Sequence, residues 1–216
     1  MTTKLYKSSR VYDFFMKRIG YEKSIDRYLA TLDINTPPAC RILDAGCGTG
    51  LLGLHFLQRW PHAELHVTDL EPNFLYTTLA NATHRGLPGD RILASVSNIT
   101  TPKQATTLDG NPHTLVDNDY NLICLGAVVG YSENTEQSLR QLMQLLAPGG
   151  ILLNLEMNET FTARFVSWRY QYRNIPLARI QEVIREEGGE LSPTSLRWKH
   201  FPAWLTRVPL IARKPG

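Results

Sequence analysis

An apolar run that ends in an acid and three closely spaced glycines most limits how this chain can fold. It reads Ile42-Leu43-Asp44-Ala45-Gly46-Cys47-Gly48-Thr49-Gly50, and a second apolar segment, 51–57, follows it. The pattern predicts a short buried strand, a turn that contains the glycines, and then a helix. Glycine in such a turn permits positive φ and lets a ligand approach the main chain closely. A tight turn without a ligand is the alternative, since short glycine matches are weak evidence.

Two phosphate-binding motifs fit this turn poorly. The dinucleotide fingerprint has its third glycine three residues after the second, where this chain has Leu51. A P-loop has Lys and then Ser or Thr after its last glycine, but two leucines follow Gly50. Arg59 is the first basic residue after Asp44. The turn therefore favours a ligand with positive charge, for which Asp44 supplies a carboxylate.

The segment 43–50 resembles the first motif of class I S-adenosylmethionine-dependent methyltransferases. A second recurrent feature of that family is similar to Leu146-Ala147-Pro148-Gly149-Gly150, which precedes an apolar run at 151–156. The resemblance is strong over residues 33–156, and the flanks share only the general layout. It implies an α/β, Rossmann-like fold: a doubly wound, mostly parallel seven-stranded sheet with helices on both faces and a C-terminal antiparallel strand.

Length and composition fit one domain. The 216 residues are 43% hydrophobic and 20% charged, which is enough to bury a full core. We expect a single methyltransferase domain, 1–216, with four parts: an N-terminal helical lid (1–36), a cofactor-binding core (37–156), a substrate-side insertion (157–175), and a last helix with a terminal hairpin (176–216).

Periodicity places the individual elements. Helices are predicted within 4–33, from 51 to near 60, and at 74–83, 133–146 and 177–187. Strands are predicted at 41–43, 64–68, 91–96, 120–125 and 151–156, and a final pair at 195–200 and 207–211. The polar segment 100–118 has no period, so we expect a long surface loop there.

The resemblance assigns S-adenosylmethionine as the cofactor, at the carboxyl ends of the strands. Asp69, nineteen residues beyond Gly50, would bind the ribose hydroxyls, although an acid before Pro72 also suits a helix cap. Asn98 stands where the family usually has Asp beside the adenine, and its amide oxygen can accept the same hydrogen bond. The expected cofactor residues are Asp44, Ala45, Gly46, Cys47, Gly48, Gly50, Asp69, Leu70, Ser97, Asn98, Ile99, Leu125 and Gly126.

The acceptor side is less constrained. Glu156, at a strand tip, is a candidate catalytic base, and Tyr131 a candidate to orient the acceptor. Segment 157–175 alternates aromatic residues with arginines, which suits nucleic acid, a flat or anionic small molecule, or simple packing. The predicted substrate contacts are Tyr6, Tyr12, Trp168 and Tyr172.

These features favour a methyltransferase that acts on a small-molecule acceptor. An RNA or protein methyltransferase and a non-catalytic binding module are the alternatives, with nucleic acid the less favoured partner. No metal is indicated, because the tips of the strands at 120–125 and 151–156 lack the combination of an acid pair and Asn that would suit Mg²⁺, and Cys40, Cys47 and Cys124 have no metal-ligand spacing. The cysteine spacing and the lack of a long apolar segment predict a soluble, cytoplasmic protein. The sequence does not set the oligomeric state.

Overall fold

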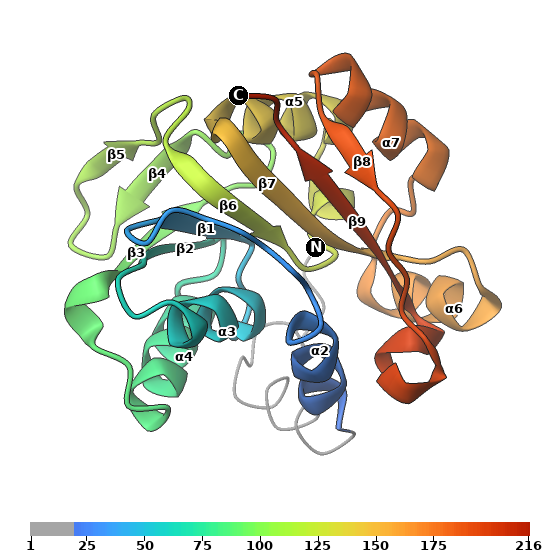
Figure 1. Ribbon diagram of the computed structural model, residues 1–216, viewed down its shortest axis with the longest axis horizontal. Helices are drawn as coiled ribbons and strands as arrows, with labels where there is room; N and C mark the ends of the chain where they lie inside the picture. The colour runs from blue at the N-terminus through green and yellow to red at the C-terminus, as the bar shows by residue number, and fades with distance from the viewer. Residues whose placement is uncertain (1–19) are drawn as a thin grey trace.

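Alternating apolar strands and amphipathic helices fold into one mixed sheet with helices on both faces (Figure 1). The computed structural model describes residues 20–216. Its strands are β1 (Arg41–Ala45), β2 (Glu64–Asp69), β3 (Ile92–Ser97), β4 (Gln104–Thr107), β5 (Pro112–Thr114), β6 (Tyr120–Leu125), β7 (Leu146–Met157), β8 (Glu190–Ser192) and β9 (Arg207–Arg213). Its α-helices are α2 (Tyr21–Leu29), α3 (Leu51–Arg59), α4 (Pro72–His84), α5 (Thr135–Leu145), α6 (Phe161–Tyr170) and α7 (Leu177–Glu186).

The sheet order is β5-β4-β3-β2-β1-β6-β7-β9-β8. Strands β3, β2, β1, β6 and β7 pair in parallel, and β9 runs antiparallel to β7. This arrangement confirms the predicted doubly wound fold with its terminal antiparallel strand. The chain leaves β1 toward β2 in one direction and leaves β6 toward β7 in the other. A crevice is therefore expected at the carboxyl ends of β1 and β6.

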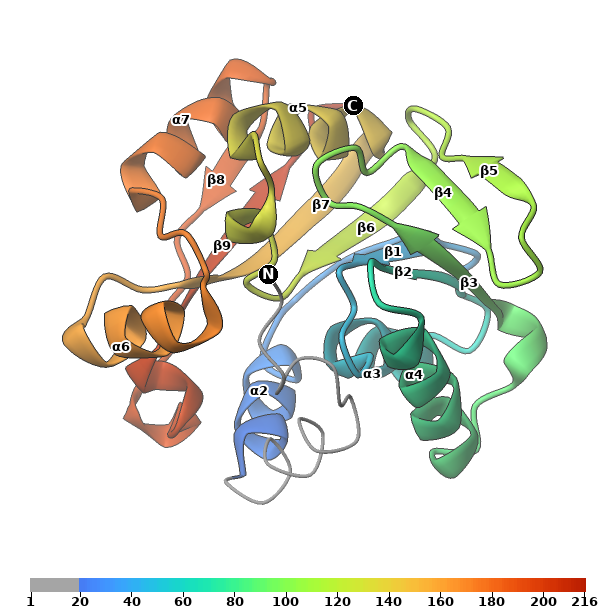
Figure 2. The ribbon, with the colours of Figure 1, turned by 180° about the vertical axis from the view of Figure 1, so that it is seen from behind.

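Successive side chains of each strand point to opposite faces of the sheet. Ile42 belongs to a buried cluster with residues of α2, α3 and α4, whereas Leu43 belongs to a cluster with residues of α5 and α7. The two ribbon views agree that these sets of helices cover opposite faces (Figures 1 and 2). The sheet is thus buried on both sides, as parallel strands require.

The prediction that residues 100–118 form only a loop is wrong. It contains the antiparallel pair β4 and β5, which extends the sheet beside β3, so the described residues form nine strands instead of seven. A turn at Gly110 (φ 85°) joins the two strands. The pair escaped prediction because it is short and polar, and only Ala105 of its residues is buried.

The predicted strand at 195–200 is also wrong. Gly188 (φ 79°) ends α7 and turns the chain, so β8 already starts at Glu190. Residues Trp198–His200 form a 3₁₀ turn, η3, because the buried His200 ring accepts a hydrogen bond from the backbone N–H of Arg197 (3.0 Å). The ring also packs edge-on against Tyr28 of α2, with 5.5 Å between the ring centroids. This segment therefore supports α2 instead of adding to the sheet.

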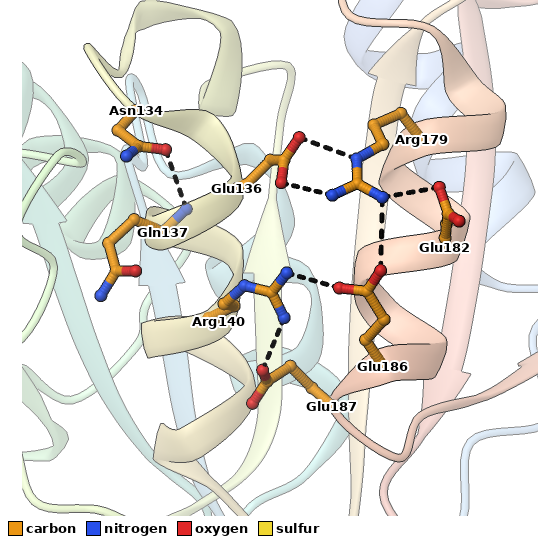
Figure 3. Close-up of polar contacts among 8 residues, drawn as sticks. All are labelled: Asn134, Glu136, Gln137, Arg140, Arg179, Glu182, Glu186 and Glu187. Carbon is orange, nitrogen blue, oxygen red and sulfur yellow. Dashed lines mark hydrogen bonds and ion pairs between the residues drawn. The ribbon is translucent and has the colours of Figure 1, made fainter.

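An ion-pair network joins α5 to α7 on the outer surface (Figure 3). Arg179 binds Glu136 through two nitrogens, at 2.7 and 2.6 Å, and also binds Glu182 and Glu186. Arg140 binds Glu186 and Glu187. Single exposed pairs stabilise little, but the shared carboxylates make these pairs a network that fixes the position of α7. Within residues 20–216, no helix combines the length and the apolar character that crossing a membrane requires.

Candidate active site

A pocket opens at the carboxyl ends of β1 and β6, where the sheet topology predicts a ligand crevice. The glycine turn after β1, helix α2, the start of α3 and the loop after β6 all contribute residues to its lining. Its lining residues are Tyr21, Glu22, Ile25, Asp44, Gly46, Cys47, Gly48, Thr49, Leu51, Leu52, Asp69, Phe74, Gly126, Ala127, Val128, Tyr131, Leu155 and Arg207.

The three glycines of the turn all have positive φ: 66° at Gly46, 56° at Gly48 and 80° at Gly50. A Cβ on Gly46 would lie 2.1 Å from Val128 Cγ2, and one on Gly50 would lie 2.6 Å from the methyl group of Thr78. A Cβ on Gly48 would meet nothing within 4 Å. Packing thus requires glycine at the outer two positions, whereas the middle glycine leaves space in the pocket.

This difference predicts separable effects of two alanine substitutions. Gly46→Ala should lower the unfolding midpoint strongly, because it adds a steric overlap to the strain of a left-handed residue. Gly48→Ala should cost only that strain, about 1–2 kcal/mol, but its methyl group should weaken cofactor binding by about tenfold or more. Thermal unfolding and calorimetric titration with S-adenosylmethionine measure the two effects. Equal unfolding midpoints for the two variants would contradict this reading of the turn.

Asp44 and Asp69 place two carboxylates in this pocket. Asp44, 1% exposed, accepts a hydrogen bond from the backbone N–H of Gly53 (2.8 Å). Asp69 accepts from the N–H of Gly48 (2.9 Å) and from that of Glu71 (3.0 Å), so it links the tip of β2 to the glycine turn. Burial, with a smaller contribution from the charge of Asp69, raises the pKa of Asp44 to about 7, and burial raises the pKa of Asp69 to about 6. A cation bound here would stabilise both charges.

Helix α2, which falls within the predicted lid, contributes Tyr21, Glu22 and Ile25 to the pocket. Glu22 also forms an ion pair with Arg85, just beyond α4. Helical periodicity alone does not predict these contacts. Tyr6 and Tyr12 lie outside the described residues, so their contact with a substrate stays a prediction.

Six of the predicted cofactor residues line the pocket: Asp44, Gly46, Cys47, Gly48, Asp69 and Gly126. The others lie elsewhere in the same region. Ala45 and Leu125 are buried strand residues, and Gly50 caps α3. The Ser97 hydroxyl donates to the carbonyl of Gln104, Asn98 Oδ1 accepts from the N–H of Thr100, and Ile99 packs against the core on the α5 side. Leu70 is 53% exposed. The cofactor roles of all thirteen residues stay predictions.

A second pocket continues from the first. The two share Tyr21, Gly126, Ala127, Tyr131 and Arg207, and the second adds Met157, Val166, Ser167, Tyr170, Tyr172, Pro202, Leu205 and Thr206. Its far wall consists of α6 and the segment around the 3₁₀ turn η4 (Ala203–Leu205), which lie side by side in both ribbon views (Figures 1 and 2). The hydroxyl of Thr160, the N-cap of α6, joins α6 to η4 by donating to the carbonyl of Leu205 (3.0 Å).

Of the predicted acceptor-side residues, Tyr131 lines both pockets and Tyr172 lines the second. Trp168 lines neither and is 74% exposed, so the structure does not bring it to the site. The small residues Ala163 and Ser167 form the buried side of α6, which turns Trp168 toward solvent, where it lies near Phe165. Tyr172 reaches the pocket because the chain reverses at Gln171 (φ 56°).

Glu156 lies beneath Tyr172 and does not line either pocket. Its carboxylate, 2% exposed, accepts hydrogen bonds from the Tyr172 hydroxyl and from the N–H of Met157 (2.7 Å). Burial raises the pKa of Glu156. The Tyr172 ring lies edge-on to Tyr131 (5.1 Å between centroids) and against Gly130, where a Cβ would come within 2.5 Å of Tyr172 Cζ. Glu156 would therefore act on an acceptor indirectly, through the hydroxyl of Tyr172.

Comparison with known proteins identifies the class. Residues 43–152 match the family model described as a methyltransferase domain. The chain therefore belongs to the methyltransferase-domain family, and the predicted class I S-adenosylmethionine-dependent methyltransferase is confirmed, together with its cofactor. Arg207, Tyr21 and the loop 127–128 are the main site residues that sequence reasoning missed.

Curated relatives and solved structures extend this result. A malonyl-[acyl-carrier protein] O-methyltransferase of Magnetococcus marinus is 27% identical over 131 residues, which cover 60% of this chain and 43% of that protein. A release factor glutamine methyltransferase of Salmonella typhimurium is 30% identical over 141 residues (60% and 50%). An O-methyltransferase family protein from Burkholderia thailandensis superimposes with a TM-score of 0.72 at 16% identity, over 96% of this chain and 60% of that one. The chain thus spans at most half the length of the curated relatives that it matches, and these act on different acceptors.

Proposed function

We propose that this chain transfers a methyl group from S-adenosylmethionine to a small-molecule acceptor bound in the second pocket. One observation carries this proposal: a pocket with one buried and one half-buried carboxylate, Asp44 and Asp69, runs directly into an aromatic pocket, and the two share five lining residues. A donor and an acceptor in adjoining pockets could be aligned for in-line displacement and kept from water, which together supply much of the catalysis.

The residues of the first pocket fit the cofactor. S-adenosylmethionine supplies a methyl carbon that its sulfonium activates. Gly48 leaves room beside the main chain, and Asp44 and Asp69 carry charge that their burial disfavours. We assign Asp44 to the positively charged part of the cofactor and Asp69 to its ribose hydroxyls. Among residues 20–216, no three His, Cys, Asp or Glu side chains gather as a metal site would require.

The second pocket offers a route for a proton. Burial and the charge of Glu156 raise the pKa of Tyr172 well above its usual value, so its hydroxyl is protonated at rest. For a hydroxyl acceptor, the Tyr172 oxygen would accept the acceptor's proton while its own proton passes to Glu156. The bond from the acceptor oxygen to its hydrogen breaks as the bond to the methyl carbon forms, and the bond from that carbon to sulfur breaks, so that the sulfonium leaves as a neutral thioether. An amine acceptor needs only to arrive unprotonated.

An RNA or protein acceptor is the alternative. The exposed aromatic side chains of α6, Phe161, Phe165 and Trp168, favour it because they stand beside Arg164 and Arg169 near the second pocket. The pocket itself favours a small molecule, since its lining residues Tyr21, Ala127, Met157 and Tyr172 are buried.

A labelled-methyl assay separates these functions. The protein is incubated with methyl-labelled S-adenosylmethionine and either the ultrafiltrate or the retained macromolecules of a cell extract. We expect the label in a small molecule from the ultrafiltrate. Label in RNA or protein alone would support the alternative. Calorimetry that detects no cofactor binding would leave only a non-catalytic module.

A further inference from the structure

We infer that the outward side of α6 docks this protein on the surface of an anionic phospholipid bilayer. The docking surface consists of five exposed aromatic side chains: Phe161, Phe165 and Trp168 on α6, and Phe201 and Trp204 on the segment beside it. The inference goes beyond the proposed function, because it concerns a partner of the protein and holds for any methyl acceptor.

Helix α6 has its apolar stripe on the outside. Phe161, Phe165 and Trp168 follow one another at spacings of four and three residues, so they project from one side of the helix. They are 90%, 64% and 74% exposed, whereas the opposite side is buried through the small residues Ala163 and Ser167. A helix of a globular protein ordinarily packs its apolar stripe on the core. The stripe of α6 is instead available to a partner.

The neighbouring segment adds to this surface. Its aromatic residues Phe201 and Trp204 are also exposed. The side-chain amide of Asn158, just before α6, donates to the carbonyl of Trp204 (3.4 Å), and α6 and η4 lie side by side in both ribbon views (Figures 1 and 2). Large exposed apolar side chains that gather on neighbouring elements mark an interaction site, not ordinary surface.

Arginines flank the stripe of α6. At about 100° per residue, Arg164 and Arg169 lie on either side of it, each about 70° from its centre. The helix contains no acid. Glu159, which precedes its N-cap, uses its carboxylate to accept a hydrogen bond from the backbone N–H of Leu177 (3.3 Å). The outward side of α6 is thus apolar along its centre and positively charged along its edges.

A phospholipid surface complements both properties. Aromatic side chains insert at the level of the headgroups, and arginines bind the phosphates and the anionic headgroups around them. The neighbouring segment has the same sign of charge, since residues 197–206 contain Arg197 and Lys199 and no acid. With ten residues, α6 is too short to cross a bilayer and would lie in the plane of its surface.

Two other partners fit these observations less well. In a dimer through α6, Arg164 and Arg169 of the two copies would approach one another, and neither helix has an acid to compensate them. Single-stranded nucleic acid is bound in a basic groove in which aromatic side chains stack on the bases. The aromatic side chains of α6 line neither pocket and project from the convex side of a helix. Side chains that project in this way suit insertion among lipids.

The first test is sedimentation of the full chain with vesicles. We expect binding to vesicles of equal parts phosphatidylcholine and phosphatidylglycerol, and binding at least about tenfold weaker to phosphatidylcholine alone. Added salt should weaken the binding to the anionic vesicles. Lipids with brominated acyl chains should quench tryptophan fluorescence of the bound protein. Trp168→Phe keeps an aromatic side chain, so it should bind as wild type but lose part of this quenching.

Substitutions on α6 then locate the docking surface. Phe161→Ser combined with Phe165→Ser should lower vesicle affinity about tenfold or more, and Arg164→Gln should lower it about fivefold. The matched controls are Tyr76→Ser on α4 and Arg185→Gln on α7, which change an exposed aromatic and an exposed arginine elsewhere. Both should bind vesicles as wild type does.

The contrary results are distinct. Wild-type protein that does not sediment with the anionic vesicles at low salt overturns the inference, and so does binding that the α6 substitutions leave unchanged. Single-stranded RNA that binds through α6 without vesicle binding assigns the surface to nucleic acid. A dimer that the Phe161 and Phe165 substitutions dissociate, again without vesicle binding, assigns it to a second copy. Unfolding midpoints are measured for all variants, and bromine quenching of wild type and Trp168→Phe decides if the serine variant does not fold. Labelled-methyl transfer is measured separately, so failure of the proposed function is distinguished from failure to dock.

Discussion

Asp44→Asn is expected to abolish S-adenosylmethionine binding and, at the same time, to stabilise the ligand-free protein. The carboxyl is fully buried and accepts one backbone hydrogen bond, from Gly53, which the amide oxygen of Asn can also accept. Burial raises its pKa to about 7, so the folded state disfavours the charge. We expect the unfolding midpoint at pH 8 to rise by several degrees, about 1–2 kcal/mol, and cofactor affinity to fall by about 100-fold or more. Thermal unfolding and calorimetry measure the two effects.

The raised pKa of Asp44 also predicts how protein stability and cofactor affinity change with pH. The pKa of Asp44 is higher in the folded state than the ordinary 3.8, so between these values the folded state binds more protons than the unfolded chain. The contribution of Asp44 to stability is therefore lost as pH rises from about 4 to 7, and Asp44→Asn should remove this part of the slope. Cofactor affinity should instead fall as pH drops through 7 and then 6, where Asp44 and Asp69 take up protons. Asp90→Asn, at an exposed site, is the control. A variant that binds the cofactor normally would remove Asp44 from the proposed site.

The part of the site that could be predicted from the sequence lies close together along the chain. Asp44, Gly46 and Gly48 follow one strand, and Asp69 ends the next strand, so local pattern and the rule for parallel sheets place them together. Arg207 and Tyr21 lie far from these residues in the sequence. Their approach depends on the antiparallel direction of β9 and on the seat of α2 against η3 and η4, which no local pattern encodes.

In segment 157–175, too, the local sequence pattern does not predict which side chains reach the site. Trp168 and Tyr172 look alike as aromatic neighbours of arginines, yet one lies in solvent and the other is buried against Glu156. The difference arises at Gln171, because its left-handed conformation ends α6 and folds the chain back, so that Tyr172 points into the protein. Glutamine is not a residue that pattern reasoning associates with such a reversal.

Tyr172→Phe and Glu156→Gln are expected to lower kcat by similar factors, about 10²-fold or more, if the acceptor is a hydroxyl. Tyr172→Phe keeps the ring against Tyr131 and Gly130 but removes the oxygen that would accept the proton. Glu156→Gln keeps a group that can accept the Tyr172 hydrogen bond but cannot take up its proton. Because the two side chains would act as one unit, the double variant should lose no more than either single variant. Steady-state rates at saturating cofactor give these factors.

The pH profile separates this proton route from a purely structural role. Burial raises the pKa of Glu156, so wild-type kcat should increase with pH as its carboxyl ionises. That limb should disappear in Glu156→Gln, whereas a variant that merely loosened the pocket would keep the limb at a lower rate. The exposed Tyr76 on α4 provides the matched control, since Tyr76→Phe removes a tyrosine hydroxyl outside both pockets. Full activity in Tyr172→Phe would exclude the route through this hydroxyl and leave alignment in the adjoining pockets as the source of catalysis.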